Sequence, residues 1–482
     1  MSIFTDKRVF GIKRKNSSGI ATAGQVCAND VILWVIFLLP INIVFHGAGQ
    51  CFVAIGLFAG NVVGWIFLSK RMNSYVEFSK KKIHNAPELF AARYDSWILK
   101  DLVSVVWIVT LGAILVSVLR VIVSVVAYFM DMDESLCLVA ITVCLVLATI
   151  LVDNRFMGII KTVVFILVIC VCLAMIGLIF YRIDVYELLD NYRRSRLSGG
   201  TSIYLNIMYY DGEHISVGSA VSMAGVGLGC IAMPLMYKGV INIRDVKELD
   251  AGRIWAIVFE GLTILSSCVL AMLVVPVLYP ERVYSGMNSF QVYNMLLKKL
   301  LGSGTVAYAA RFFMLMVFVL AVVVMMESLM RNICEHMRGM VPPVFKDHSY
   351  VKLLVDIGVV VITGIALFFV AECSKYNREM MIVRSWGLCA AALAAPLMFT
   401  LMYRNSTRSG MFAGIISGII AYFLWQYLPI IDNGSLSEYF SLSGDVPGFL
   451  VSALFCLVVS AATDKNSEDE LKVFDRMRAD QS

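Results

Sequence analysis

Two acidic residues stand inside long apolar runs of the chain, where a charge is costly. Asp30 lies in the stretch ANDVILWVIFLLP, and Glu260 lies in the stretch RIWAIVFEGLTILSS. A charged side chain at the centre of a bilayer costs roughly 3 kcal/mol or more, so acids in such runs commonly handle ions or protons. Arg253 precedes Glu260 by seven residues and shares its helix face, two turns away. We therefore take Asp30 and Glu260 as candidate ion-coupling residues.

The sequence does not indicate other kinds of reactive site. The twelve cysteines are scattered through apolar runs without a CxxC pair, and the five histidines show no HExxH spacing. The chain has no G-x-S-x-G turn and no phosphate-binding loop. We expect no metal site, no resident cofactor and no enzymatic activity.

Composition places the chain in the membrane. Of its 482 residues, 59% are hydrophobic and only 16% are charged, with a mean hydropathy of +0.80. Apolar runs of about 18 residues or more recur along the whole length, which is the signal of transmembrane helices. The sequence predicts an all-α polytopic membrane protein that contacts membrane lipids, and the net charge of +5 requires no nucleic-acid partner.

Lysine and arginine residues gather in alternate loops, which sets the expected orientation. Both termini are predicted in the cytoplasm, with the protein in the cell membrane (inner or plasma membrane). The chain divides into a tail at 1–26, a membrane domain at 27–463 and a tail at 464–482. Twelve spans are expected at 27–45, 50–69, 102–129, 135–152, 157–181, 215–237, 254–279, 304–329, 351–371, 383–403, 410–428 and 447–463.

Two spans carry signs of interruption. The first holds Asp30 and a later proline, and the sixth, five spans on, holds Gly225, Gly227 and Gly229 ahead of Pro234. Transporters built from inverted repeats open each repeat with a helix that is broken near the bilayer midplane. The glycines could instead form a small-residue packing face. The spacing favours a five-plus-five inverted repeat, with repeats at about 27–181 and 215–403 and extra helices at about 410–463.

Five motifs follow one another along the chain: ANDVILWVIFLLPINIVFHGAGQCFVAIGL (Ala28–Leu57), PELFAARY (Pro87–Tyr94), GVGLGCIAMP (Gly225–Pro234), STRSGMFAG (Ser406–Gly414) and VPGF (Val446–Phe449). Together they resemble the sodium:solute symporter family, and most closely the bacterial sodium/proline symporters. The resemblance covers nearly the whole chain from Ala28 onward.

This resemblance implies a LeuT-type fold and ion-coupled import of a small organic solute, an amino acid such as proline, by alternating access. It implies that Asp30 is the acid associated with sodium coupling. Backbone carbonyls near Ala28 and Val31 would hold the coupling Na⁺. The solute would bind between the first and sixth helices, where the candidate pocket residues are Trp34, Gly225, Gly227, Gly229 and Pro234.

The eighth helix departs from the family pattern. It has no serine or threonine between Thr305 and Ser328, and Val317 and Phe318 stand where the family has an adjacent Ser-Thr pair. Sodium prefers hard oxygen ligands, which these two side chains do not supply. Sodium coupling is therefore the family expectation, and proton coupling is an alternative.

Three roles for Asp30 stay open at this point. It could assist sodium entry, it could carry a coupling proton because a neutral acid is tolerated in the bilayer, or it could cap the start of the first helix. A different function would be a solute sensor or regulatory membrane protein that does not transport.

Overall fold

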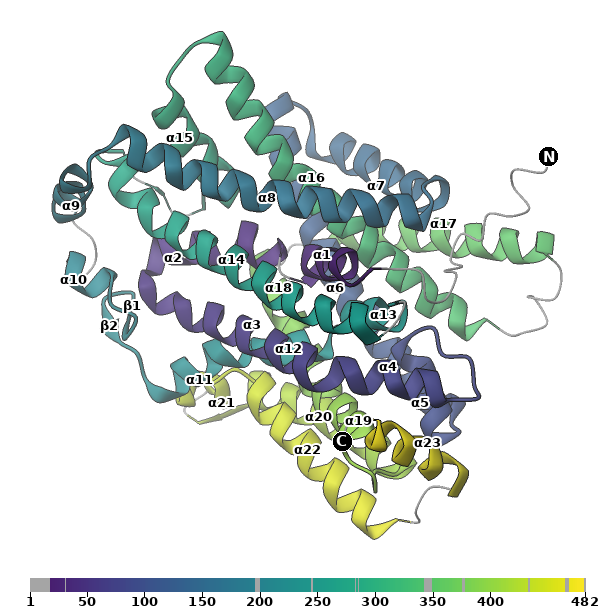
Figure 1. Ribbon diagram of the computed structural model, residues 1–482. Helices are drawn as coiled ribbons and strands as arrows, with labels where there is room; N and C mark the ends of the chain where they lie inside the picture. Colours follow the sequence, from purple (N-terminus) through teal and green to yellow (C-terminus); the bar gives the residue numbers. More distant parts are fainter. Residues whose placement is uncertain are drawn as a thin grey trace.

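Apolar runs dictate the architecture, because a backbone inside a bilayer must satisfy its own hydrogen bonds and an α-helix does so within one segment. The computed structural model describes residues 18–30, 32–195, 200–243, 246–281, 283–284, 286–341, 349–374, 378–431, 434–463 and 468–480. Val31 and residues 1–17 of the expected N-terminal tail lie outside the described residues. Long helices make up most of the described chain (Figure 1).

Eleven helical segments are long and apolar enough to cross a membrane, and the bent pair at the start of the chain brings the number to as many as twelve. The predicted all-α polytopic fold is confirmed. The first helix begins at Gly19 rather than at residue 27. The spanning helices are α1 and α2 (Gly19–Asp30, Leu39–His46), α3 and α4 (Cys51–Val63, Ser69–Phe78), α6 (Trp97–Met130), α7 (Glu134–Leu151), α8 (Asn154–Arg182), α11 to α13 (Val217–Gly225, Gly227–Ala232, Pro234–Ile241), α14 (Val246–Leu278), α16 (Thr305–Met340), α17 (Ser349–Cys373), α18 and α19 (Arg378–Cys389, Ala395–Met402), α20 (Arg408–Tyr427) and α22 (Asp445–Ala462).

The helices of the two repeats pack on one another in a reciprocal pattern. Helix α1, which opens the first repeat, packs on α14, the second helix of the other repeat, and α12 packs on α3 in the same way. Likewise α6 packs on α18 and α8 packs on α16, while the two fourth helices, α7 and α17, pack on each other. Each of these contacts has a counterpart with the repeats exchanged, as expected of an inverted five-plus-five repeat. The extra helices α20 and α22 lie side by side (Figure 1).

Each repeat opens with an interrupted helix. In the first repeat the axis bends by 46° between Gly19–Asp30 and Leu33–His46. In the second, Met233 has an extended backbone between α12 and α13, directly before Pro234. Proline lacks an N–H and disfavours the helical conformation of the residue before it, which explains the position of this break. Val226 separates α11 from α12 between Gly225 and Gly227, but its backbone stays in the helical region. The larger interruption therefore lies at the proline.

Three segments inside these helices wind as π-helix, a geometry that is frequent at functional sites. Hydroxyl groups from other helices bond to carbonyls of the first such segment: Ser267 Oγ donates to the Val35 carbonyl at 2.7 Å, and Ser289 Oγ donates to that of Phe37 at 2.6 Å. These bonds tie the start of the first repeat to α14 and α15. The π-helical segments are Leu33–Leu38, Gly64–Leu68 and Ala390–Ala394.

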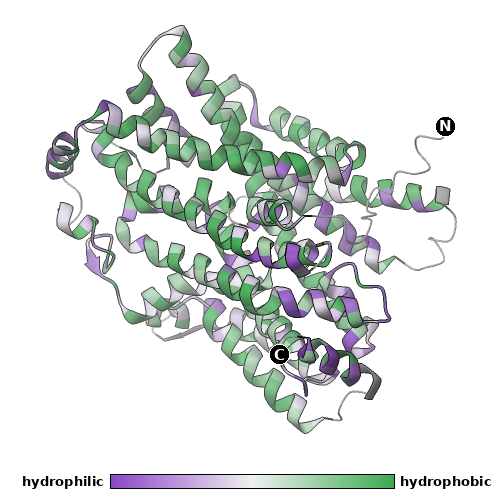
Figure 2. Ribbon diagram, viewed as in Figure 1, coloured by the Kyte–Doolittle hydropathy of each residue, from purple (hydrophilic) through white to green (hydrophobic). Residues whose placement is uncertain are grey.

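Polar residues gather at the two ends of the long helices, and apolar residues cover the stretches between them (Figure 2). Many large apolar side chains on these stretches are exposed, as expected for contact with lipid. We call one end the α5 end, because it carries α5 (Ala86–Tyr94) beside α4 and α23 (Glu468–Ala479). The opposite, hairpin end carries α9 (Val185–Arg194), α10 (Thr201–Tyr204), the β1–β2 hairpin (Tyr209–Tyr210, Glu213–His214), α15 (Ser289–Leu301), the β3–β4 hairpin (Pro429–Ile431, Gly434–Ser435) and α21 (Leu436–Phe440).

At the α5 end, two of the sequence motifs meet. Arg93, from PELFAARY, donates to the Tyr403 carbonyl at 2.9 Å and to Ser406 Oγ at 3.2 Å, and Tyr94 lies 2.8 Å from the same hydroxyl. Ser406 opens the motif STRSGMFAG. The two motifs therefore form one buried joint between α5 and the α19–α20 connection.

Helix α23 closes over this joint. The Phe474 ring lies 4.1 Å from the Arg93 guanidinium carbon, and Phe474 is buried. Arg404 makes two hydrogen bonds to the Asp475 carboxylate, at 2.7 and 2.9 Å, and Ser74 Oγ donates to Asp480 at 2.8 Å. This short helix is thereby fixed to the α5 end.

Candidate ion and solute site

Asp30 lies at the bend of the first interrupted helix. It is the last residue of α1, its side chain is 1% exposed, and neither carboxylate oxygen has a hydrogen-bond partner among the described residues. An N-cap residue stands at the first turn of a helix. Because α1 begins at Gly19, the hypothesis that Asp30 caps the start of this helix is wrong. Ala28 is buried in the same last turn, and Val31 lies outside the described residues.

Glu260 lies in the middle of α14, the helix on which α1 packs. It is fully buried, and its two carboxylate oxygens also lack a partner within the described part of the chain. The two acids lie close enough for their charges to interact. Arg253 does not pair with Glu260, since it bonds to the Trp65 and Ile66 carbonyls at 3.1 and 3.0 Å. The structure thus brings together the two acids that were predicted separately.

This acid pair has the chemistry of a cation or proton site. Two neighbouring buried carboxylates repel each other, so a shared proton or a bound cation stabilises the pair. Carboxylate oxygens are hard ligands that suit Na⁺. The thiols of Cys27 and Cys230 lie within electrostatic range of both acids. In the described ranges no group of three or more His, Cys, Asp or Glu residues is arranged to hold a metal ion.

A second buried cluster has the opposite arrangement of charge. Glu327 on α16 pairs with Arg331 one turn later and with Lys161 of α8, whose Nζ lies 3.1 Å from Glu327 Oε2. Arg331 also donates to the carbonyls of Thr149 and Val152 at 3.3 and 3.2 Å. Glu327 and Arg331 thus form an ion pair within α16, and Lys161 joins it from the fifth helix. Here the acid is fully paired.

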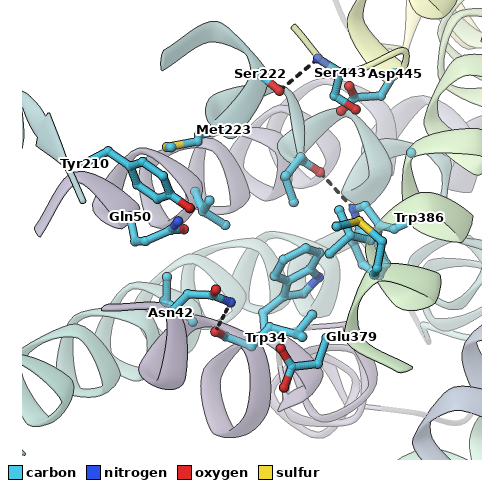
Figure 3. A pocket seen from close by; sticks show the side chains of 17 residues that line it. Trp34, Asn42, Gln50, Tyr210, Ser222, Met223, Glu379, Trp386, Ser443 and Asp445 are labelled. Carbon is cyan, nitrogen blue, oxygen red and sulfur yellow. Dashed lines mark hydrogen bonds between the residues drawn. The ribbon is translucent and has the colours of Figure 1, made fainter. Parts of the chain in front are cut away.

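A cavity of about 320 Å³ lies between the first and sixth helices, on the hairpin side of the acid pair. This volume is at the lower end of small-molecule sites. Trp34 lines it, as predicted; Gly225, Gly227, Gly229 and Pro234 are not among its lining residues. Figure 3 shows polar side chains around it from several helices. Its lining is Trp34, Leu38, Leu39, Asn42, Gln50, Val53, Tyr210, Ser222, Met223, Val226, Glu379, Met380, Val383, Trp386, Gly387, Ser443 and Asp445.

Two indole rings form one wall of this cavity. Trp34 and Trp386 meet edge to face with ring centroids 5.6 Å apart, and Trp386 Nε1 donates to the Val226 carbonyl at 2.8 Å. A Cβ atom at Gly229 would lie 1.9 Å from Trp386 Nε1, so the absence of a side chain there admits the ring. Gly229 thus shapes the cavity without lining it.

The other glycines of the sixth span provide close helix packing. A Cβ at Gly227 would lie 2.0 Å from the Gly56 carbonyl of α3, and one at Gly225 would lie 2.5 Å from the Val446 side chain of α22. Gly225 and Gly227 therefore lie where helices pack closely, as the alternative of a small-residue packing face expects.

Carbonyls next to the second break are engaged by side chains. Trp107 Nε1 donates to the Ala232 carbonyl at 3.0 Å, and the Tyr237 hydroxyl donates to the Ile231 carbonyl at 2.6 Å. An ion at this break would have to compete with these donors. Protein donors thus occupy carbonyls of both interrupted helices, at Val35 and Phe37 as well as beside Pro234. The carboxylates of Asp30 and Glu260, in contrast, have no such partner in the described chain.

Several residues of these sites were not identified from the sequence. Lys161 could have been found, because it is a charge inside an expected span. Asp445 directly precedes the motif VPGF, and Glu379 lies near the start of the expected tenth span. Asn42, Gln50 and Tyr210 carry no sequence signal, since their place in the cavity depends on how separate helices meet.

Comparison with solved structures identifies the fold. A Na⁺-coupled sialic acid symporter in a substrate-bound, outward-open state is 13% identical, with a TM-score of 0.69; the match covers 94% of this chain and 91% of that one. Mhp1, a nucleobase-cation-symport-1 family transporter in a closed conformation with bromovinylhydantoin bound, is 10% identical, with a TM-score of 0.53 and coverage of 98% and 100%. No protein-family model and no curated protein sequence matches the chain. The chain has the LeuT-type fold of these transporters.

Proposed function

We propose that this protein is a secondary active transporter that imports a small organic solute by ion-coupled symport with alternating access. The observation that carries the proposal is the buried acid pair, Asp30 and Glu260, at the bend of the first interrupted helix. The fold and the cavity between the first and sixth helices support it, because LeuT-type transporters bind solute and ion beside such breaks.

The arrangement suggests how ion and solute would be coupled. Asp30 and Trp34 are four residues apart on the same interrupted helix, one in the acid pair and the other in the cavity wall. A cation that neutralises the acid pair would stabilise one position of this helix, and solute packed against Trp34 would stabilise the same position. Each would then favour binding of the other.

Two coupling ions are candidates. The family resemblance suggests Na⁺, held by Asp30 with backbone carbonyls near Ala28 and Val31. A proton is the alternative, because α16 has the apolar side chains of Val317 and Phe318 where that family has hydroxyl groups. Both side chains are buried, and Phe318 packs on Tyr293 with ring centroids 5.0 Å apart. Glu260 would share either ion with Asp30.

The resemblance also suggests the solute and the orientation. An amino acid such as proline is the first solute to test. With both termini in the cytoplasm, the α5 end would face inward and the cavity would lie on the outer side of the acid pair.

Uptake of labelled proline and a panel of other solutes into proteoliposomes tests the proposal. It would be run with a sodium gradient, a proton gradient and no gradient. We expect uptake driven by one gradient and reduced at least tenfold in Asp30→Asn. The control Glu187→Gln, which changes an exposed acid of α9, should transport normally. Solute binding without uptake under any gradient would instead identify a sensor.

A further inference from the structure

The charged groups that line the cavity are all acidic. Glu379 of α18 and Asp445 of α22 contribute carboxyl groups, whereas none of the described lining residues is Lys, Arg or His. Figure 3 shows the two acids on different sides of the cavity, with Trp34 and Trp386 between them. A solute carboxylate in this space would meet two carboxyl groups, with no basic side chain among the described lining residues to attract it.

Asp445 provides a buried acceptor at the cavity. Its side chain is 3% exposed, and its Oδ1 atom has no hydrogen-bond partner among the described residues. Asp445 is also the first residue of α22, where the helix dipole favours a negative charge. A cation in the cavity would supply the partner that Oδ1 lacks.

Aromatic faces complete a binding surface for a cation. Trp34, Trp386 and Tyr210 all line the cavity, and tryptophan is the best side-chain partner in cation–π contacts. Alkylated ammonium groups combine a positive charge with an apolar surface and are commonly held by such rings. The leucine, valine and methionine side chains around the cavity suit the apolar part of such a solute.

Trp34 adds an unsatisfied donor at the cavity wall. The indole N–H of Trp34 is buried and has no acceptor within the described part of the chain. A solute oxygen would satisfy this group, because a buried donor without a partner is costly. Neutral donors such as this indole suit a hydroxyl or ether oxygen, whereas a carboxylate is held most strongly by a positively charged donor.

We propose that the solute is a small organic cation, an alkylated ammonium with a hydroxyl or ether oxygen, held by Asp445 and Glu379 and by the rings of Trp34 and Trp386. This inference rests on the proposed transport function for its biological meaning, but binding tests it directly. It favours a cation over a zwitterion such as proline.

The test is equilibrium binding to the purified full-length protein in nanodiscs, followed by tryptophan fluorescence. The probes are choline, its uncharged carbon isostere 3,3-dimethylbutan-1-ol, glycine betaine and proline. We expect choline to bind at least tenfold more tightly than the isostere and more tightly than either zwitterion. Equal binding of choline and its isostere, tighter binding of betaine or proline, or no binding of choline would overturn the inference.

Variants locate the binding to this cavity. Asp445→Asn should weaken choline at least tenfold while leaving the isostere unchanged, and Asp445→Glu should restore part of the loss. Glu379→Gln provides a second test if Asp445→Asn does not fold, and Glu187→Gln is the control. If the Asp445 and Glu379 variants fold and bind choline with unchanged affinity, the cation binds elsewhere and the proposed site is rejected.

Binding and transport can fail separately. Preferred binding of choline without uptake under any gradient would leave this inference standing and reject the proposed transport. Gradient-driven uptake of an anion or a zwitterion, with choline excluded, would leave transport standing and reject the cation.

Discussion

The two buried charge clusters of this molecule are opposites. On α16, one acid is shared by two cations, as Glu327 pairs with both Arg331 and Lys161. At the bend of the first helix, two acids, Asp30 and Glu260, have no partner among the described residues. Both clusters lie in the membrane domain, and the members of each come from two different helices.

This difference separates a structural role from a role in binding. Buried ions that are fully paired fix how helices meet, and breaking such a pair is costly. Buried acids without a partner do not stabilise the fold in this way, so their presence indicates that they bind a ligand reversibly. If this contrast is correct, substitutions in the paired cluster should destabilise the protein far more than substitutions of the unpartnered acids.

Glu327→Gln should cause the largest loss of stability. It leaves Lys161 and Arg331 buried without an acid, and removing one partner of a buried pair typically costs about 3–5 kcal/mol. Unfolding of the purified protein, followed by heat or denaturant, measures the loss. Glu335→Gln on the same helix is the matched control, because its partner Lys238 is part-exposed and the loss should be smaller. Equal losses would contradict a special role for the Glu327 cluster.

Trp107→Phe should have an intermediate effect. It removes the indole donor of the Ala232 carbonyl and leaves only the weak thiol donor of Cys389, at 3.8 Å. A buried polar group that is poorly satisfied costs roughly 1–3 kcal/mol. Trp255→Phe, a change on the lipid-exposed side of α14, should be nearly neutral. If both variants unfold alike, the Cys389 thiol alone satisfies the Ala232 carbonyl.

Asp30→Asn and Glu260→Gln should change stability by no more than about 1 kcal/mol, because neither removes a partner of a described group. Ion-driven uptake should nevertheless fall at least tenfold in both. Unfolding and uptake measured on the same preparations separate the two effects. A stability loss as large as that of Glu327→Gln would reveal a structural partner of the acid pair.

Lowering the pH should release α23 from the α5 end, with a smaller loss of stability than any of the substitutions above. The hydrogen bonds from Arg404 lower the pKa of Asp475, so this exposed pair stabilises docking above the ordinary pKa of aspartate. That contribution is lost as the pH falls through the lowered pKa, below about 4. Spin labels on α23 and α4 would report the separation. Asp475→Asn should release α23 more readily at neutral pH. An unchanged distance at both pH values would show that the buried apolar side chains of α23, Phe474 and Met477, are sufficient for docking.

The sequence predicted the fold because its main signals are local. Span number and the repeat follow from apolar run length, and the second break follows from Pro234 alone. The glycines were harder to interpret, because both packing and unwinding use small residues and only the neighbours at Gly56 and Trp386 distinguish them.

The site was only partly predictable. Asp30 and Glu260 could be identified because a charge in an apolar run needs an explanation, but their approach depends on how α1 packs on α14. Whether each acid has a partner depends on the side chains of all the helices around it, and the sequence does not show which helices these are. The cavity depends even more on assembly, because Asp445 and Glu379 come from separate helices near the end of the chain.

The docking of α23 has a consequence for the order of biosynthesis. Ser74 and Asp480, which bond to each other, are 406 residues apart in the chain. During synthesis, the surface of α4 and α5 that α23 covers must therefore wait until nearly the whole membrane domain has been made and inserted. Chains generally fold from their N-terminal parts first. Closure of the α5 end is thus a late event of assembly, and a ribosome stalled before α23 would leave Arg93 and its joint uncovered.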